Sequence, residues 1–401
     1  MSFAIRQIPL LREGRRPRVW SVAFPDPASP LGVREDDAVG MVANVAIGKG
    51  VTVRNDFDNI SIYDRPMFNA TWDAVSRKWV DLVRQGEEGF SWCPTQERRE
   101  VLYRCRPFWY RLSMNGDHRP DRISVTDRPL PGYTLAPMFK NGEDFVYRPV
   151  FTITLDENGM AHSRLVNPKV VCAYDELLPS VKLFDPKART ESVLDWFSEW
   201  LLLIVEFARW DVGTLMPGRK VTFLHIHGDA VKGVTASSGA IAFEDTCIWR
   251  GKENAWRGAN STLCDLLLVK ESDEPSAPAT LYYLPDPLKY TGVLNEHYVP
   301  IGSFCHTQEL VCADVTDFAM SSYGFLYPAA VAQAGVHQRC GVFYNGKSAA
   351  KYPILVSVGG SSESAMFPLD YPPSPLNWEC IQRYAMRGTL CGGRLVLDEG
   401  V

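Results

Sequence analysis

Apolar residues recur at helical spacing over residues 190–210, and they leave room for only one polar stripe. A period of 3.6 residues with apolar side chains on most sides predicts a buried helix. We expect it to begin at Asp185–Pro186 or at Thr190, to end near Trp210, and to be on the order of 30 Å long. The polar stripe consists of Glu191, Asp195, Ser198, Glu199, Glu206 and Arg209. The apolar run Leu201–Val205 is too short to cross a membrane and has charged neighbours.

A second amphipathic stretch lies earlier in the chain, at residues 70–85. Asn69 is a suitable N-cap and Gly86 is placed to end a helix. Five apolar residues fall on one helical face: Trp72, Val75, Trp79, Leu82 and Val83. This spacing predicts a first helix from Ala70 to Gln85.

The rest of the chain favours strands. Alternating and β-branched runs predict short strands within 39–63, with a turn at Gly48–Gly50. Longer strands are expected at 104–114, 122–126 and 144–154, the first two around a hairpin signal at Asn115–Asp117. After Gly218 the predicted strands are 221–226, 240–249, 263–270, 280–284, 340–345, 354–358 and 394–397. Long loops separate them, and loops of that length in a compact domain are usually functional.

Residues 1–38 are rich in proline and arginine and show little periodicity. Pro25, Pro27 and Pro30 favour extended, irregular backbone. We predict an extended arm at 1–38 and a main domain at 39–401. A separate small β segment at 39–68 stays open as an alternative.

Composition narrows the function classes. The 401 residues are 46% hydrophobic, enough for a substantial core, and the net charge is −5. This balance gives no electrostatic footprint for nucleic acid or for an anionic membrane. The 10 cysteines form no Cys-x-x-Cys pair and no apolar leader opens the chain, so we expect reduced thiols in a protein made in a cytoplasm.

Motifs for catalysis are lacking in the sequence. We find no Gly-x-Ser-x-Gly elbow, phosphate-binding loop or dinucleotide fingerprint, and Gly359–Ser364 is interpreted as a loop. His225 and His227 share a face of the predicted strand 221–226 and its continuation, and three copies could bind a metal at a trimer axis. Two ordinary hydrogen-bonded histidines are the preferred interpretation. We therefore predict no catalytic residue, no metal and no cofactor.

Residues Cys247–Asp265 carry the densest set of distinctive side chains. Trp249 and Trp256 bracket a polar run, and Gly251 marks a place where a side chain would obstruct the backbone. We predict a hydrogen-bonded cluster of Arg250, Glu253 and Asn254 packed between the two rings. A structural role is the preferred interpretation, with a ligand or catalytic role as the alternative.

The loops before the last strand collect residue types that suit adaptable binding surfaces. Tyrosine and tryptophan give contact area, while serine and asparagine give hydrogen bonds at low entropic cost. The candidate ligand- or receptor-binding residues are Tyr344, Asn345, Tyr352, Ser361, Ser362, Tyr371, Asn377 and Trp378. Ordinary long loops with inward-folded aromatics remain the alternative.

The order of these motifs resembles that of phage and prophage tail-fibre or minor structural virion proteins with a C-type-lectin-like fold. The run Trp249–Trp256 is similar to their Arg-Gly-x-Glu-Asn-x-Trp signature. The other matching landmarks are Asn55–Ile60, Pro107–Tyr110, Arg122–Ser124, Gly132–Phe139, Glu206, Asp211, Gly359–Gly360, Ala365–Phe367, Gly388 and Gly393–Leu395. The resemblance implies an α+β fold in which two main helices pack on a twisted antiparallel sheet. It also implies long loops that present a ligand surface near the C-terminus.

Three functions are expected from this resemblance. The first is a non-enzymatic receptor-binding protein of the virion, at a tail or fibre tip, which binds host-surface carbohydrate or protein. Its other partners are virion proteins and copies of itself, most simply in a homotrimer. The second is a structural virion subunit in capsid decoration or tail assembly. The third is an oxidoreductase of the formylglycine-generating type, which needs an activated cysteine pair that Cys380 and Cys391 do not obviously reproduce.

Overall fold

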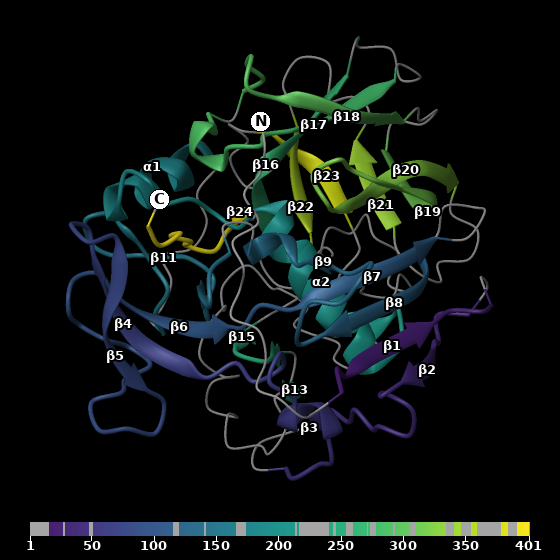
Figure 1. Cartoon of the computed structure of the whole chain (residues 1–401). Coiled ribbons are helices and arrows are strands. Elements are labelled where there is room, and N and C mark those ends of the chain that lie inside the picture. Colours follow the sequence, from purple (N-terminus) through teal and green to yellow (C-terminus); the bar gives the residue numbers. More distant parts are fainter. Residues whose placement is uncertain are drawn as a thin grey trace.

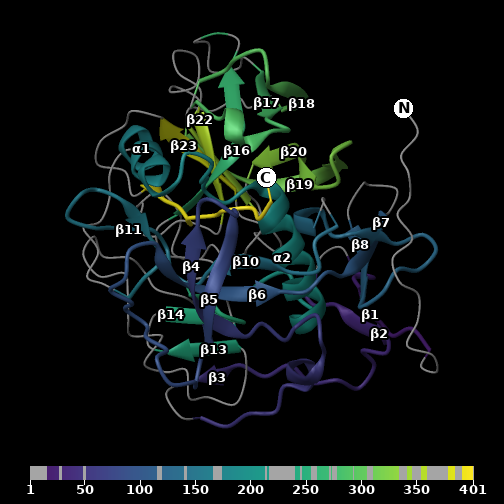
Figure 2. The same ribbon diagram turned by 60° about the vertical axis from the view of Figure 1, so that its left-hand side comes forward.

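One buried helix lies in the middle of the molecule, and sheets surround it (Figures 1 and 2). The structure is a computed structural model. It describes residues 16–26, 29–47, 51–114, 120–139, 142–165, 174–212, 215, 240–243, 246–253, 260–270, 272, 278–291, 293–304, 310–333, 341–345, 354–358, 378–383 and 391–400.

The central helix is α2 (Val193–Phe207), and all of its residues are buried. Ser192 caps its N-terminus in a capping box with Asp195, and Ala208 ends it in the left-handed conformation at φ 51°. The helix predicted over 190–210 is therefore confirmed. Its polar stripe does not face solvent, however, because further layers of the protein cover that side as well.

Two antiparallel sheets from the first half of the chain flank α2. The five-stranded sheet has the order β2 (Val33–Asp36), β1 (Val19–Ala23), β8 (Pro120–Thr126), β7 (Trp109–Met114), β9 (Thr134–Leu135). The four-stranded sheet has the order β10 (Val146–Pro149), β6 (Arg99–Cys105), β4 (Met67–Asp73), β5 (Lys78–Arg84). A two-stranded ribbon follows, of β11 (Thr154–Leu155) and β12 (Ala161–His162).

Two more sheets come mainly from the second half of the chain. The smaller has the order β15 (Lys252–Glu253), β14 (Thr246–Trp249), β13 (Ala240–Phe243), β3 (Ala46–Ile47), with β3 parallel to β13. The larger has the order β18 (Val299–Phe304), β17 (Ala279–Tyr283), β16 (Asn260–Lys270), β22 (Ile354–Val358), β23 (Trp378–Arg383), β21 (Gly341–Asn345), β19 (Leu310–Met320), β20 (Leu326–Gln333), and β24 (Cys391–Gly392) pairs with β16.

The larger sheet is curled so that its two edge strands approach each other. The Tyr327 hydroxyl on β20 donates a 2.5 Å hydrogen bond to the Ile301 carbonyl on β18. Gly302 lies so close to the Tyr327 ring that an added Cβ would come within 2.5 Å of it. The contact covers two strand edges that would otherwise be open to pairing with another chain.

The helix predicted at 70–85 is wrong, because these residues form the hairpin β4–β5. Trp72 and Trp79 are cross-strand partners with their ring centroids 5.2 Å apart, and the Trp72 indole donates to Asp185. Asn69 caps no helix, since its side chain exchanges two hydrogen bonds with the Ser91 backbone. A spacing of seven residues places two side chains together on a helix, and a short turn between strands does the same.

The second helix of the described structure is α1 (Tyr174–Phe184), which contains Pro179 and was not predicted. The described residues also include three short 3-10 turns: η1 (Asp56–Asn59), η2 (Pro137–Phe139) and η5 (Pro287–Lys289). Two α-helices and largely antiparallel sheets among the described residues confirm the α+β class. None of the described helices has the length and apolar character that crossing a membrane requires.

The N-terminal residues are more regular than their prolines suggested. β1 pairs with β8, and Trp20 and Val22 belong to the main core. Arg34 on β2 donates hydrogen bonds to the Val205 and Glu206 carbonyls at the end of α2, where cations are favoured. Residues 19–36 therefore contribute two strands to the five-stranded sheet. The domain boundary at residue 38 stays a prediction.

Several strand predictions are confirmed and others are wrong. Residues 51–53 form no strand. The stretch 104–114 contains the end of β6 and all of β7, 144–154 splits into β10 and β11, and 240–249 contains the antiparallel pair β13 and β14. The run 394–397 is extended, but only Val396 forms an isolated bridge, to Arg189. Leu395, Val396 and Leu397 are all buried, so burial rather than sheet pairing explains their apolar character. The predicted strand 221–226 lies outside the described residues.

Candidate functional site

Three carboxylates follow one another along α2: Asp195, Glu199 and Glu206. Their spacings of four and seven residues place them on one stripe of the helix. All three are buried, at 2%, 5% and 0% exposure. Buried charges are costly unless they are paired, so the surrounding elements must supply cations.

Glu206 is held by the motif that dominated the sequence. The guanidinium of Arg250 contacts both of its oxygens, at 2.8 and 2.7 Å, and the Trp249 indole N–H donates to Oε2 at 2.8 Å. The Asn55 side chain donates to Oε1 at 2.8 Å. Arg250 also reaches Asp58 at 3.0 Å. One carboxylate thereby joins the end of α2 to β14 and to the start of η1.

The backbone that presents Arg250 is strained. Arg250 and Gly251 form the two-residue connection between β14 and β15, with φ values of 47° and 88°. Such hairpin turns favour Asn-Gly or Gly-Gly, because a side chain is disfavoured at positive φ. Gly251 also lies against Tyr103, where an added Cβ would come within 2.8 Å of the Tyr103 Cβ. Arginine occupies the strained position because its side chain is bound to Glu206.

Glu199 has three partners from three different elements. Lys252 donates to Oε2 at 2.6 Å, Arg65 approaches Oε1 at 3.1 Å, and the Tyr103 hydroxyl donates to Oε1 at 2.5 Å. Lys252 also bonds to Glu191, one residue before the helix cap. Arg65 lies over the Trp249 ring at 4.6 Å, so the Glu199 and Glu206 clusters are in contact.

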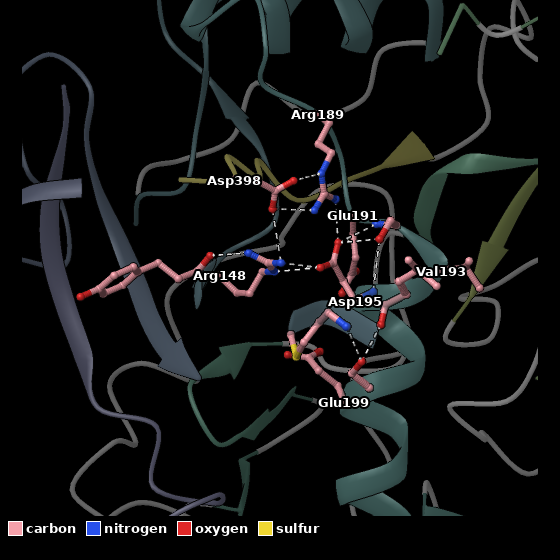
Figure 3. A network of polar contacts seen from close by, with 12 residues as sticks. Arg148, Arg189, Glu191, Val193, Asp195, Glu199 and Asp398 are labelled. Atoms are coloured by element: carbon pink, nitrogen blue, oxygen red, sulfur yellow. Dashed lines mark hydrogen bonds and ion pairs between the residues drawn. The ribbon is translucent and has the colours of Figure 1, made fainter. Parts of the chain in front are cut away.

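Asp195 completes the row near the start of α2. Arg148 and Arg189 each approach it at 2.6 Å, and Arg189 also pairs with Asp398 at 2.9 Å. Figure 3 shows these side chains converging from β10, from the segment before α2 and from the C-terminal segment. The same Asp195 accepts hydrogen bonds from Ser192 in the capping box. The chain end is therefore fixed to the helix start.

The cations govern the ionisation of the row. Burial by itself raises the pKa of Asp195, but Arg148 and Arg189 hold that pKa well below its ordinary value. Burial likewise raises the pKa of Glu199, and Lys252 and Arg65 outweigh it and bring the pKa to about 2. Both carboxylates are ionised at neutral pH, and both are engaged by donors, which leaves them poorly suited to accept a proton as a general base.

The open space beside this row is small. A cavity of about 10 Å³ lies against Arg189, Asp195, Asp265, Tyr283 and Asp398. A volume of that size holds about one water molecule and not an organic substrate. Nearby Cys105 and Cys264 are buried, and burial raises the pKa of the Cys105 thiol to about 11. Such thiols are protonated and unreactive at neutral pH.

The structure brings four of the six predicted signature residues together. Trp249, Arg250, Gly251 and Glu253 are buried together around the β14–β15 turn, and the polar contacts of Arg250 are structural. Asn254 and Trp256 lie outside the described residues, as do His225 and His227, so the predicted packing between two rings stays a prediction. Trp249 does have a cationic neighbour on its ring face, which is Arg65.

The candidate binding residues divide between two ends of the same strands. β21 runs parallel to β23 and β22 runs antiparallel to it, with Trp378 opposite both Val342 and Val358. Asn345 ends β21 at the other end, where Ile354 pairs with Arg383. Tyr344 is paired within the sheet, with Val311 and Cys380. Tyr352, Ser361, Ser362, Tyr371 and Asn377 lie outside the described residues.

Sequence reasoning missed three of the cations around the buried row. Arg65, Arg148 and Arg189 come from separate elements, and no local pattern marks them, whereas Arg250 and Lys252 belong to the polar run after Trp249. A signal was present in α2 itself, because carboxylates on a helix that is otherwise apolar all round require partners. That argument predicts that cations exist without identifying them.

The comparisons with known proteins add no family to this geometry. A scan against models of protein families finds no match, and a search of curated proteins finds no similar sequence. The resemblance to phage virion proteins therefore remains a hypothesis that depends on the motifs alone.

Proposed function

We propose that the chain is a non-enzymatic virion protein of a phage, located at a tail or fibre tip, with a C-type-lectin-like fold. It binds host-surface carbohydrate or protein through residues of the segment that links β22 to β23. The virion is its site of action, and the other virion proteins are its structural partners. The motif order in the sequence supports the family, and the strand pairing supports the choice of segment.

The observation that carries the choice is the register of β21, β22 and β23. Trp378, Val342 and Val358 are neighbours at one end of these strands, so the segment 359–377 begins and ends at that end. Five of the eight candidate residues belong to this segment or to Trp378, which directly follows it. Asn345 and Tyr352 belong to the connection at the opposite end, about 13 Å away at ~3.3 Å per residue. A ligand that contacts one contiguous surface is therefore expected to use the candidate residues within 359–378.

The ion-paired helix supports a binding function over a catalytic one. The buried carboxylates Asp195, Glu206 and Glu199 are tied to arginine and lysine inside the core, where they join elements together. A rigid scaffold of this kind suits long segments that present side chains for contact. The homotrimer that we infer multiplies weak contacts through avidity. Sedimentation should then give three times the chain mass of 45.0 kDa, and a stable monomer would contradict the trimer.

The experiment compares two tyrosine substitutions that remove the same atoms. Tyr371→Ala should weaken adsorption of the purified protein to host cells, whereas Tyr352→Ala should leave it unchanged, with equal melting temperatures for both. Trp378→Ala is a second variant on the binding side. Adsorption that survives both Tyr371→Ala and Trp378→Ala would refute this surface. A position of the protein within a capsid lattice, seen by imaging the particle, would favour the structural-subunit hypothesis instead.

A further inference from the structure

Figure 2 shows the sheet β10-β6-β4-β5, and two arginines lie at one end of one of its faces. Arg104 on β6 pairs with Tyr147, and Arg84 on β5 pairs with Phe68, which lies in register with Leu102. Alternate residues of a strand share a face, so Leu102 and Arg104 lie on the same side as Phe68 and Arg84. Arg106 follows directly after β6.

The other end of this face is closed. Ala70, Trp72 and Leu102 pack against Val181 and Phe184 of α1 and against the C-terminal leucines. That cover does not include the arginine end, where Arg84 is exposed and Arg104, Arg106 and Phe145 are half-buried. The face therefore changes from a buried core to a partly open basic surface.

Aromatic rings hold two of the guanidiniums in place. The Arg104 guanidinium lies 4.4 Å from the centroid of the Phe145 ring and 5.1 Å from that of Phe68. The Arg106 guanidinium lies 5.2 Å from the same Phe145 centroid. Two like charges thus share one ring, which supplies cation–π attraction but cannot neutralise them.

In the part of the chain that the structure describes, these arginines lack the carboxylate partners that Arg65, Arg148, Arg189 and Arg250 have in the core. Among the described residues, no ion pair within 4.0 Å involves Arg84, Arg104 or Arg106, and the buried Nε atoms of Arg104 and Arg106 have no acceptor. Arg104 also hydrogen-bonds to the Tyr147 side chain. Two nearby carboxylates are Glu399, which accepts from the Trp79 backbone N–H at 2.8 Å, and Glu87, which accepts from the Arg84 backbone N–H at 2.8 Å. In a chain of net charge −5, three arginines that form no ion pair with a described residue and lie beside aromatic rings are a distinctive surface.

We propose that Arg84, Arg104 and Arg106, with the half-buried ring of Phe145, bind an acidic saccharide, while the buried Phe68 ring holds Arg104 in place. A guanidinium matches a carboxylate in bidentate geometry, and an aromatic ring gives a flat apolar surface for a sugar ring. Duplex nucleic acid fits less well, because protein–DNA affinity commonly draws on six to ten phosphate contacts. The site is on a different sheet from β22 and β23, and it does not rest on the proposed function.

The test uses polygalacturonate, a polymer of sugar rings with one carboxylate each, titrated into the full-length protein by calorimetry. Arg104→Gln and Arg106→Gln should each weaken binding by about tenfold, as expected for one hydrogen-bonded charge. Arg111→Gln is the matched control, since Arg111 is exposed on β7 and the substitution changes the net charge equally. Melting temperatures of all variants establish that they fold.

The ligand class is tested with three further polymers. Methyl-esterified polygalacturonate keeps the rings and lacks the charge, whereas polyglutamate keeps the charge and lacks the rings, so both should bind at least tenfold more weakly. Oligothymidylate at equal charge concentration should also bind more weakly. Equal affinity of the Arg104→Gln, Arg106→Gln and Arg111→Gln variants would overturn the site. Equal binding of polyglutamate or oligothymidylate would overturn its assignment to a saccharide.

Discussion

Replacing Glu206 by glutamine tests whether the buried carboxylates stabilise the fold. Glu206 is fully buried, and it accepts hydrogen bonds from Arg250, Trp249 and Asn55. The amide keeps the shape of the side chain and removes its charge. Among the described residues, the Arg250 side chain, 3% exposed, is then left with Asp58 as its carboxylate contact, at 3.0 Å.

The expected loss follows from the cost of leaving a buried charge without its partner. Removal of one member of a buried pair typically destabilises a protein by about 3–5 kcal/mol. Total stabilities of proteins are about 5–15 kcal/mol, so Glu206→Gln should remove a large fraction of the folding free energy. With an unfolding entropy of about 2.1 cal/mol/K per residue, the melting temperature should fall by roughly 5 °C.

Urea unfolding followed by tryptophan fluorescence measures this loss. Glu35→Gln is the control, because Glu35 pairs with Arg122 at the surface with both side chains about 40% exposed. Its expected cost is about 1 kcal/mol or less. Adding Arg250→Met to Glu206→Gln should restore part of the lost stability, because the orphaned cation is then removed. If Glu206→Gln costs no more than Glu35→Gln, the buried row does not stabilise the protein.

Two further predictions follow from the same contacts. Gly251→Ala should destabilise the protein by ~1–3 kcal/mol more than Gly86→Ala, because both glycines have φ near 90° but only Gly251 lies against Tyr103. Equal losses of stability in urea unfolding would mean that backbone strain alone, and not the contact with Tyr103, causes the effect. The pKa of Glu199, about 2, lies below its unfolded value of ~4.3, so the ionised group stabilises the fold above pH ~4.3 and this contribution is lost as the pH falls toward 2. That loss should be on the order of 3 kcal/mol and smaller in Glu199→Gln, and identical acid profiles for wild type and variant would contradict it.

Local patterns predicted the elements whose surroundings are uniform. Helix α2 is apolar on nearly every side, so its burial followed from its own sequence. The strand β8 follows from its alternation in the same way. The local pattern did not distinguish the hairpin β4–β5 from a helix, because Trp72 and Trp79 lie next to each other in either structure. The hairpin also depends on the pairing of β4 with β6 across the sheet.

The site was harder to predict than the elements, because its members are brought together only by the tertiary fold. Glu206 and Trp249 were each singled out from the sequence, but their hydrogen bond joins residues 43 positions apart. Arg189 and Asp398, 209 positions apart, carry no signature at all. The division of the candidate binding residues between two ends of β21–β23 likewise depends on the parallel pairing of β21 with β23, which no local pattern specifies.

Hydrogen exchange of the α2 backbone, followed by mass spectrometry, tests the central claim most directly. If α2 is an interior helix fixed by its ion pairs, the amides of residues 193–207 should exchange only when the whole protein unfolds. Their protection should then fall in Glu206→Gln by the same free energy as the stability measured in urea. Exchange of these amides within seconds, while the strands β16 and β17 stay protected, would contradict the account.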